Sequence, residues 1–150
     1  KMNPPLRTSG DVEAIRAGLA DGTIDCVATD HAPHTAAAKS RPLAQAPSGV
    51  IGMETALAVL WSRLVDPGLL TPSRLVESMS AAPARAFGLS GGALAPGSSA
   101  DIVLFDPERD WVVRPEAFRS RSRNCPFAGM RLKGRVAMTI VAGQVRFEAR

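Results

Sequence analysis

The sequence predicts an α/β fold, with β/α units up to about residue 90 and a small β-rich unit over residues 91–150. Three observations favour this order. Apolar residues recur at helical spacing in several stretches of the first part. A short, mostly apolar run at residues 24–28 is typical of a strand buried in a parallel sheet. After Gly91-Gly92, short β-rich runs separated by Pro, Gly and Asp replace the helical pattern.

Two helix starts are visible from their capping residues. Thr8 and Ser9 are both N-cap candidates for the first helix, because a hydroxyl there can accept a backbone N–H of the first turn. Thr71 can cap a second helix, and Pro72 fits the first helical position. Helices are expected over residues 10–20, 53–65, 72–79 and 82–87.

Loops and strands fill the remainder of the chain. The strand at residues 24–28 runs directly into a polar loop at residues 29–34, and residues 35–49 lack periodicity, which predicts a mobile loop. Ala142-Gly143 is a tight-turn signal and predicts a hairpin between the runs on either side. The β-rich runs of the second unit cover residues 102–105, 111–113, 135–141 and 144–147.

Composition excludes several classes of protein. The chain has 150 residues, 45% of them hydrophobic and 21% charged, which is enough to bury a core. Its net charge is +4, but basic residues are spread out except at Arg119, Arg121 and Arg123, and only 5% of residues are aromatic, so nucleic-acid binding is not expected. The chain contains no apolar run near the ~18 residues that span a membrane.

The cysteines and the first residues indicate location and context. Cys26 and Cys125 are isolated, which disfavours a zinc knuckle or a disulfide scaffold and favours a reducing compartment, so a cytoplasmic protein is expected. Lys1-Met2-Asn3 has neither a starter methionine nor leader character. The chain is therefore expected to begin inside a longer protein.

The densest polar cluster is Asp30-His31-Ala32-Pro33-His34, which contains both histidines of the chain. It follows a predicted buried strand, the position at which β/α barrels carry catalytic groups. The alternative is a loop-capping aspartate with two surface histidines. Because a catalytic zinc normally takes three protein ligands, this chain is not expected to form a complete metal site. Either the site is not metallic, or its other ligands lie upstream of Lys1.

Several motifs resemble those of a known family. Class I dihydroorotases are the family resembled by residues 1–7 (KMNPPLR), 21–25 (DGTID), 28–34 (ATDHAPH) and 52–57 (GMETAL). The closing segment of the wider amidohydrolase superfamily is resembled by residues 83–89 (PARAFGL), Gly97 and residues 100–103 (ADIV). The motifs follow one another in the order and spacing of the family over nearly the whole chain.

The resemblance implies a fold and an activity. Residues 1–90 would be the C-terminal part of a TIM-like (β/α) barrel, and residues 91–150 part of a small β-sandwich. A complete barrel needs ~250 residues, so an HxH motif and most metal ligands would lie upstream. The implied activity is the zinc-dependent, reversible cyclisation of N-carbamoyl-L-aspartate to dihydroorotate in pyrimidine biosynthesis, with two zinc ions in the complete enzyme.

The resemblance also assigns roles to single residues. Asp30 would be both a zinc ligand and the catalytic residue that shuttles a proton. Asn3 and His34 would contact the substrate, His34 near its carboxylate. The backbone around Ser48 and Gly49 would close over the pyrimidine ring. Family members commonly have Phe before that glycine, and Ser48 departs from this pattern.

Residues beside these positions have simpler interpretations. His31 is expected to be structural or to support the site without touching substrate. Glu54 is interpreted as a carboxylate favoured by the dipole at a helix N-terminus, Asp101 as a turn or strand-entry residue, and Cys26 as a small buried hydrophobic residue.

Two other functions remain open from the sequence. Hydantoinases and allantoinases tend to lack the second histidine after the aspartate, so His34 favours dihydroorotase. A non-catalytic subunit that scaffolds aspartate carbamoyltransferase would typically lose metal ligands, and the presence of Asp30 and His34 weighs against it. The expected partners are a small-molecule substrate and either a second copy or aspartate carbamoyltransferase.

Overall fold

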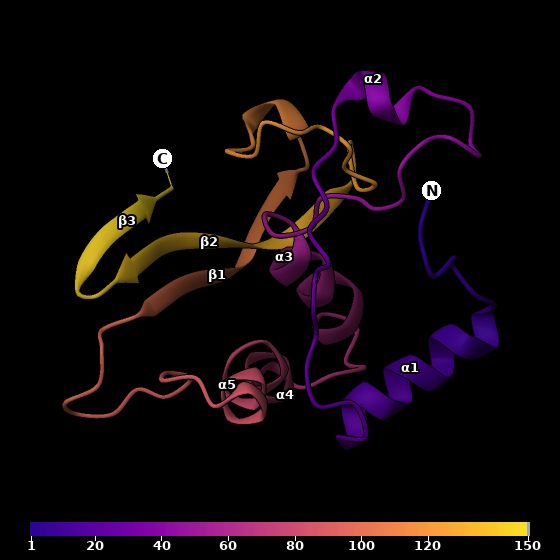
Figure 1. Ribbon diagram of the computed structural model, residues 1–150. Coiled ribbons are helices and arrows are strands. Elements are labelled where there is room, and N and C mark those ends of the chain that lie inside the picture. Colours follow the sequence, from indigo (N-terminus) through magenta and orange to yellow (C-terminus); the bar gives the residue numbers. More distant parts are fainter. Residues whose placement is uncertain (150) are drawn as a thin grey trace.

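The computed structural model describes residues 1–149 and has the predicted α/β character (Figure 1). Its α-helices are α1 (Ser9–Asp21), α2 (Ala36–Lys39), α3 (Ala56–Leu60), α4 (Pro72–Val76) and α5 (Ala82–Phe87). Single π-helical turns, η1 (Trp61–Val65) and η2 (Glu77–Ala81), continue α3 and α4, and η3 (Pro115–Ala117) is a 3₁₀ turn. The strands are β1 (Ile102–Val112), β2 (Arg131–Val141) and β3 (Gln144–Glu148).

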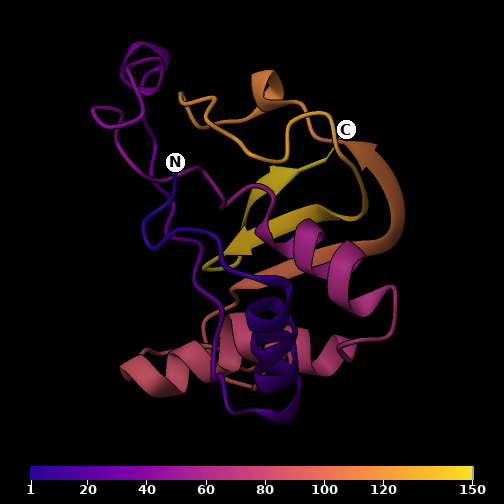
Figure 2. The ribbon, with the colours of Figure 1, turned by 90° about the vertical axis from the view of Figure 1, so that its right-hand side faces the viewer.

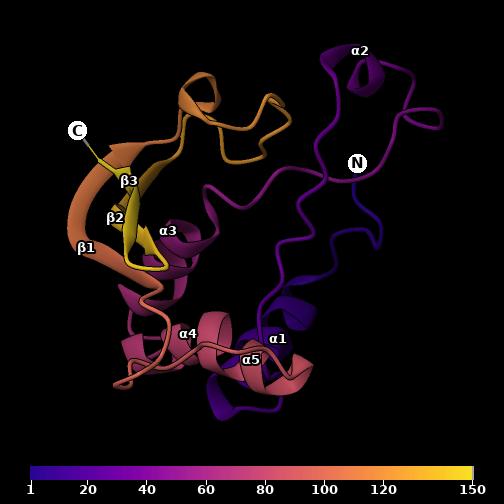
Figure 3. The same ribbon diagram turned by 60° about the vertical axis from the view of Figure 1, so that its left-hand side comes forward.

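Helices and strands occupy different sides of the molecule. Helices α1, α4 and α5 gather at one end, with α1 lying across the pair in the rotated view (Figure 2). The sheet lies on the other side, and α3 packs against β2 between the two groups. The segment that carries α2 extends away from the helices, on the same side as the N-terminus (Figure 3). Among residues 1–149, no helix combines the length and apolar character needed to cross a membrane.

Helix α1 begins at Ser9, one residue before the predicted range, and of the two cap candidates Thr8 is the N-cap. The Thr8 hydroxyl accepts the Asp11 N–H at 3.3 Å, and the Asp11 carboxylate accepts the Thr8 N–H at 2.9 Å, which forms a reciprocal capping box. Gly22 ends the helix with a φ of 90°, a left-handed conformation that glycine adopts without steric cost.

The prediction of a strand at residues 24–28 is wrong. The segment is not a strand, because no neighbouring strand among residues 1–149 offers it a ladder of hydrogen bonds. Its Val27 N–H instead donates to the Ser78 carbonyl oxygen at 3.0 Å. The loop predicted at residues 35–49 contains α2. The helix predicted from residue 53 begins at Ala56, after a turn closed by Thr55 N–H donation to Gly52.

The three strands form one antiparallel sheet in the order β1-β2-β3. Strand β1 is continuous across the predicted gap, with a bulge between Asp106 and Asp110. The β2–β3 hairpin is confirmed: Ala142 and Gly143 have φ of 49° and 76°, both positive as a type I′ turn requires. Asp101 accepts the Ala142 N–H at 2.7 Å, which agrees with its expected turn role.

Two hydrophobic clusters hold the fold together. The first joins α1 to the other helices through Leu19, Leu64, Val65, Leu70 and Leu75. The second joins α3 to the sheet through Ala58, Val113 and Leu132. Close packing beside this contact requires glycine at position 134, because a Cβ there would overlap the Phe105 ring.

Candidate functional site

Asp30 stands at the end of the extended segment that follows α1. Its φ is 43°, a left-handed conformation that aspartate tolerates better than most residues. The residue is exposed, and within residues 1–149 its carboxylate has no hydrogen bond or ion pair. The carboxylate is therefore free to meet a ligand.

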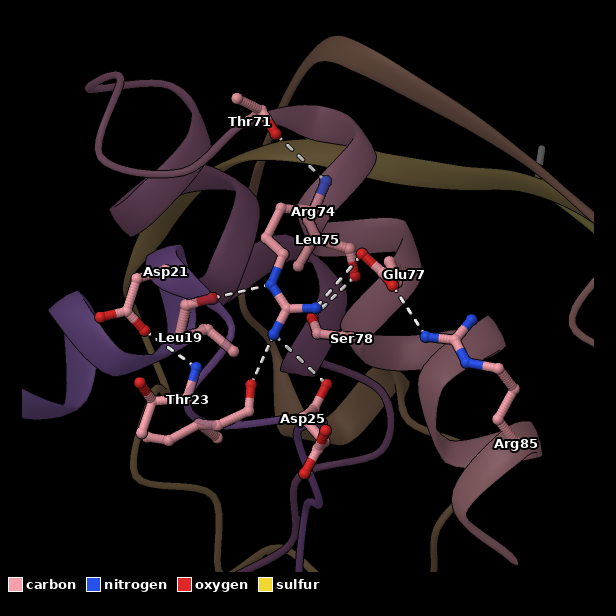
Figure 4. Close-up of polar contacts among 11 residues, drawn as sticks. Leu19, Asp21, Thr23, Asp25, Thr71, Arg74, Leu75, Glu77, Ser78 and Arg85 are labelled. Atoms are coloured by element: carbon pink, nitrogen blue, oxygen red, sulfur yellow. Dashed lines mark hydrogen bonds and ion pairs between the residues drawn. The ribbon is translucent and has the colours of Figure 1, made fainter. Parts of the chain in front are cut away.

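Arg74 fixes the start of that extended segment (Figure 4). Its guanidinium donates from Nε to the Leu19 carbonyl oxygen at 2.8 Å and from Nη2 to the Ile24 carbonyl oxygen. The Arg74 side chain is only 14% exposed and also pairs with Glu77 at 3.3 Å. Helix α4 thereby joins the end of α1 to the chain that leads to Asp30.

Glu77 links Arg74 to a second arginine. Arg85 donates to Glu77 Oε1 at 2.8 Å. Hydrogen bonds from Arg85 and then from Arg74 lower the pKa of the Glu77 carboxyl group, with burial acting weakly in the other direction. The stability that this interaction contributes is therefore present above the ordinary glutamate pKa and is lost as the pH falls through the lowered value.

Replacing Arg74 by alanine should destabilise the protein. Two carbonyl groups lose a charged donor, so we expect the free energy of unfolding to fall by about 2 kcal/mol. Arg74→Lys should recover only part of this loss, because an ammonium group lacks the planar fork that reaches both carbonyl oxygens. Urea unfolding measures the difference. Arg63→Ala, at an exposed position, is the matched control, and an equal loss in that variant would contradict the assigned role.

The two histidines point to different partners. His31 Nδ1 accepts the N–H groups of Gly52 and Met53 at 3.1 and 3.3 Å, which agrees with its expected structural role. His34 is half-buried, and its Nε2 lies 2.9 Å from the Ser48 carbonyl oxygen, to which it donates. Because Nε2 carries this proton, the neutral imidazole has its lone pair on Nδ1.

Three of the predicted site residues therefore meet in one place. His34, Ser48 and Gly49 lie together, and a Cβ added to Gly49 would lie 2.6 Å from Ala32 Cβ. The Gly49 N–H donates to the Lys1 carbonyl oxygen at 2.9 Å, which brings the N-terminal segment alongside. Asn3 is exposed near this contact, and neither its side chain nor that of Asp30 is bonded to the other three residues.

Sequence reasoning missed the residues that support this loop. Lys39 Nζ donates to the Pro47 and Gly49 carbonyl oxygens at 3.1 and 3.0 Å. Ser122 and Asn124 bond to the same loop from the far end of the chain. No local spacing signals these partners, because each is an ordinary polar residue at a distant sequence position.

The interpretation of Glu54 requires a correction. Helix α3 starts only at Ala56, and the Glu54 carboxylate accepts the N–H groups of Arg119 and Ser120 at 3.0 and 3.1 Å. The residue therefore anchors the arginine-rich segment instead of facing the helix dipole. Cys26 is only half-buried, not a fully buried hydrophobic residue.

A wide groove lies elsewhere on the molecule. A groove of about 760 Å³ runs between α3 and the sheet, lined among others by Leu57, Phe105, Trp111, Phe118 and Phe147. None of the predicted site residues lines it. Within residues 1–149, no three His, Cys, Asp or Glu side chains come together as metal ligands.

Comparison with known proteins shows which proteins this chain resembles. Two curated relatives, both named dihydroorotase, come from Pelotomaculum thermopropionicum and from Anaeromyxobacter sp. strain K. The first is 50% identical over 100% of this chain and 35% of its own length, and the second is 50% identical over 99% and 34%. The chain thus spans about a third of the length of these relatives.

Solved structures agree in fold. An L-hydantoinase (dihydropyrimidinase) from Arthrobacter aurescens matches with a TM-score of 0.93 and 34% identity, over 99% of this chain and 34% of that one. A D-hydantoinase from Thermus sp. matches with a TM-score of 0.91 and 30% identity, over 98% and 33%. The model of the amidohydrolase family matches residues 3–146, and the chain belongs to that family.

Proposed function

We propose that this chain is the carboxyl-terminal third of a dihydroorotase, which interconverts N-carbamoyl-L-aspartate and dihydroorotate. The observation that carries the proposal is the 50% identity to proteins named dihydroorotase along the whole chain. The proteins named hydantoinase are more distant, at 34% and 30% identity.

The same proposal extends to the complete fold. Residues 1–90 would close a TIM-like barrel, and residues 91–150 would contribute the three-stranded sheet to a β-sandwich. The TM-score of 0.93 over nearly the whole chain supports a shared architecture with the hydantoinase structure. A boundary near residue 90 remains a prediction.

Asp30 suits the role of zinc ligand and proton shuttle. An exposed carboxylate with no partner among residues 1–149 is a suitable oxygen donor for zinc. Bound zinc makes water a nucleophile near neutral pH and polarises an amide carbonyl. Asp30 would take a proton from the attacking water and return it to the ring nitrogen that leaves. Two ions are expected, with the other ligands supplied by upstream residues.

Substrate recognition would use the loop that joins His34 to Gly49. Asn3 and His34 would donate to the substrate, and the backbone at residues 48–49 would cover the ring. To donate to a carboxylate, His34 must either gain a proton on Nδ1 or exchange the Ser48 carbonyl oxygen for substrate. Ser48 stands where family members commonly have Phe, but the contact with His34 uses the main-chain carbonyl oxygen of residue 48 and does not depend on its side chain.

Location and partners also remain predictions. The two half-buried, unpaired cysteines fit the reducing cytoplasm that we propose. We also propose that the complete protein associates with a second copy or with aspartate carbamoyltransferase. A small-molecule substrate follows from the assigned chemistry.

Substrate competition tests the function. We expect the complete polypeptide that carries these residues to hydrolyse dihydroorotate with a kcat/KM at least about 100-fold higher than for hydantoin or allantoin, because a site built for the substrate carboxylate leaves its donors unpaired with the other rings. Preference for hydantoin would favour a hydantoinase. The absence of turnover with any of these substrates, in zinc-loaded protein, would favour a scaffold subunit.

The 150 residues alone should behave differently. Because they supply one predicted metal ligand where a catalytic zinc takes three or more, we expect weak zinc binding and no turnover. Isothermal titration with zinc measures the first, and an assay with dihydroorotate measures the second. Tight binding of two zinc ions would refute the assignment of the ligands to upstream chain.

A further inference from the structure

We propose that Ser122 and Asn124 are positioning residues that hold the substrate-binding loop from the far end of the chain. The inference rests on the proposed function, in which His34 and Gly49 face the substrate. Through Ser122 and Asn124 it gives a role to the segment that contains Arg119, Arg121 and Arg123, although these arginines take no part in the proposed chemistry.

The Ser122 hydroxyl contacts both the N–H and the carbonyl group of His34. It accepts the His34 N–H at 2.9 Å, nearer than the second acceptor of that N–H, Asn124 Oδ1 at 3.4 Å. The hydroxyl lies 2.5 Å from the His34 carbonyl oxygen and 2.6 Å from Asn124 Oδ1. Its single proton can be donated to only one of these two oxygens at a time. Ser122 is 8% exposed, so water does not easily replace these contacts.

The Asn124 side chain bonds to the chain at both ends of the loop, at Ala32 and at Gly49. Its Nδ2 group donates to the carbonyl oxygen of Ala32 at 2.9 Å and to that of Gly49 at 3.3 Å. One side-chain amide therefore joins the segment before the loop to the segment after it. The backbone carbonyl oxygen of Asn124 also accepts the Ile51 N–H at 3.2 Å.

These contacts set the geometry of the predicted substrate contacts. The His34 ring bonds to the Ser48 carbonyl oxygen, and Asn124 bonds to the chain beside each of these two residues. The position of the ring therefore depends on both segments staying in place. Arg74 and the bond from Val27 to Ser78 hold the segment before Asp30, and these contacts do not involve Ser122 or Asn124. We expect loosening of the Ser122–Asn124 contacts to disturb substrate binding more than proton transfer.

Steady-state kinetics of the complete polypeptide distinguish positioning from general stability. We expect Ser122→Ala and Asn124→Asp each to raise the KM for dihydroorotate about tenfold, as a lost buried hydrogen bond to loop backbone would. The kcat value should fall less than about threefold, and zinc content should not change. His34→Ala should shift KM in the same direction. Ser122→Thr, which keeps the hydroxyl group, should restore most of the affinity.

Ser62→Ala is the matched control. The Ser62 hydroxyl also bridges one N–H and one carbonyl group, both of Lys133, at 2.7 and 2.9 Å, but it joins η1 to β2, away from the loop. It should lower stability without changing KM. An equal KM change in Ser62→Ala, or an unchanged KM in both Ser122→Ala and Asn124→Asp, would overturn the inference.

Hydrogen exchange separates this inference from the proposed function. In Ser122→Ala, the amide of His34 should exchange at least about tenfold faster, while amides of α1 stay protected. If the wild-type protein has no activity on dihydroorotate but this local change is seen, the proposed function fails and the positioning contact stands. If the protein is active and the His34 amide stays equally protected both in Ser122→Ala and in the Ser122→Ala, Asn124→Ala double variant, which removes both acceptors, the positioning role fails alone.

Discussion

Asp30→Ala should reduce the kcat for dihydroorotate hydrolysis by at least about 10³-fold. General acid–base catalysis alone is worth 10²–10⁴-fold, and the same carboxylate is proposed to bind zinc, so its removal should cost both contributions. Steady-state kinetics and metal analysis of the complete polypeptide measure the two effects. Near-normal activity in Asp30→Ala would refute the assigned role.

Asp25→Ala provides the control for this experiment. Asp25 is an exposed carboxylate in the same extended segment. Within residues 1–149 its side chain makes no hydrogen bond or ion pair, and its backbone carbonyl oxygen accepts a hydrogen bond from Arg74. We therefore expect kcat to stay within about twofold of the wild-type value. A large loss in both variants would mean that the segment, and not the Asp30 carboxylate, is what catalysis requires.

Gly49→Ala should destabilise the loop and weaken substrate binding together. The Gly49 φ is 108°, where an L-residue is strained by about 1–2 kcal/mol. An added Cβ would also lie 2.6 Å from Ala32 Cβ, and such overpacking costs about 1–3 kcal/mol. The loop must open to relieve this contact, so we expect a total loss of about 2–5 kcal/mol in unfolding free energy and a higher KM.

Gly68→Ala isolates the backbone contribution. Gly68 has a φ of 78°, and nothing lies within 4 Å of an added Cβ, so this variant carries the backbone strain without the clash. Urea unfolding of both variants gives the difference. If Gly49→Ala loses no more stability than Gly68→Ala, the close packing of Gly49 on Ala32 does not constrain the loop.

Elements with local signals could be predicted from the sequence. The capping box at Thr8 fixes the start of α1, and the positive φ angles at Ala142 and Gly143 follow from a turn signal between two β-rich runs. Helix α5 was likewise expected at its observed residues, 82–87. In each case neighbouring residues decide the conformation.

Elements that depend on distant partners could not be predicted from the sequence. Residues 24–28 have a strand-like composition, but a strand also needs a neighbour, and here Arg74 and Ser78 hold the segment instead. Similarly, Ser122 bonds to His34 across 88 residues, and no sequence spacing predicts such a contact. Motif resemblance predicts roles for His34 and Gly49, whereas only the structure shows which distant residues bond to them.

The position of the metal tests the central claim most directly. Crystals of the complete, zinc-loaded polypeptide would give an anomalous difference map at the zinc edge. We expect a zinc peak within about 2.0–2.2 Å of an Asp30 carboxylate oxygen, the usual distance for such a ligand. Zinc bound in full occupancy elsewhere, with the Asp30 carboxylate facing solvent, would contradict the account.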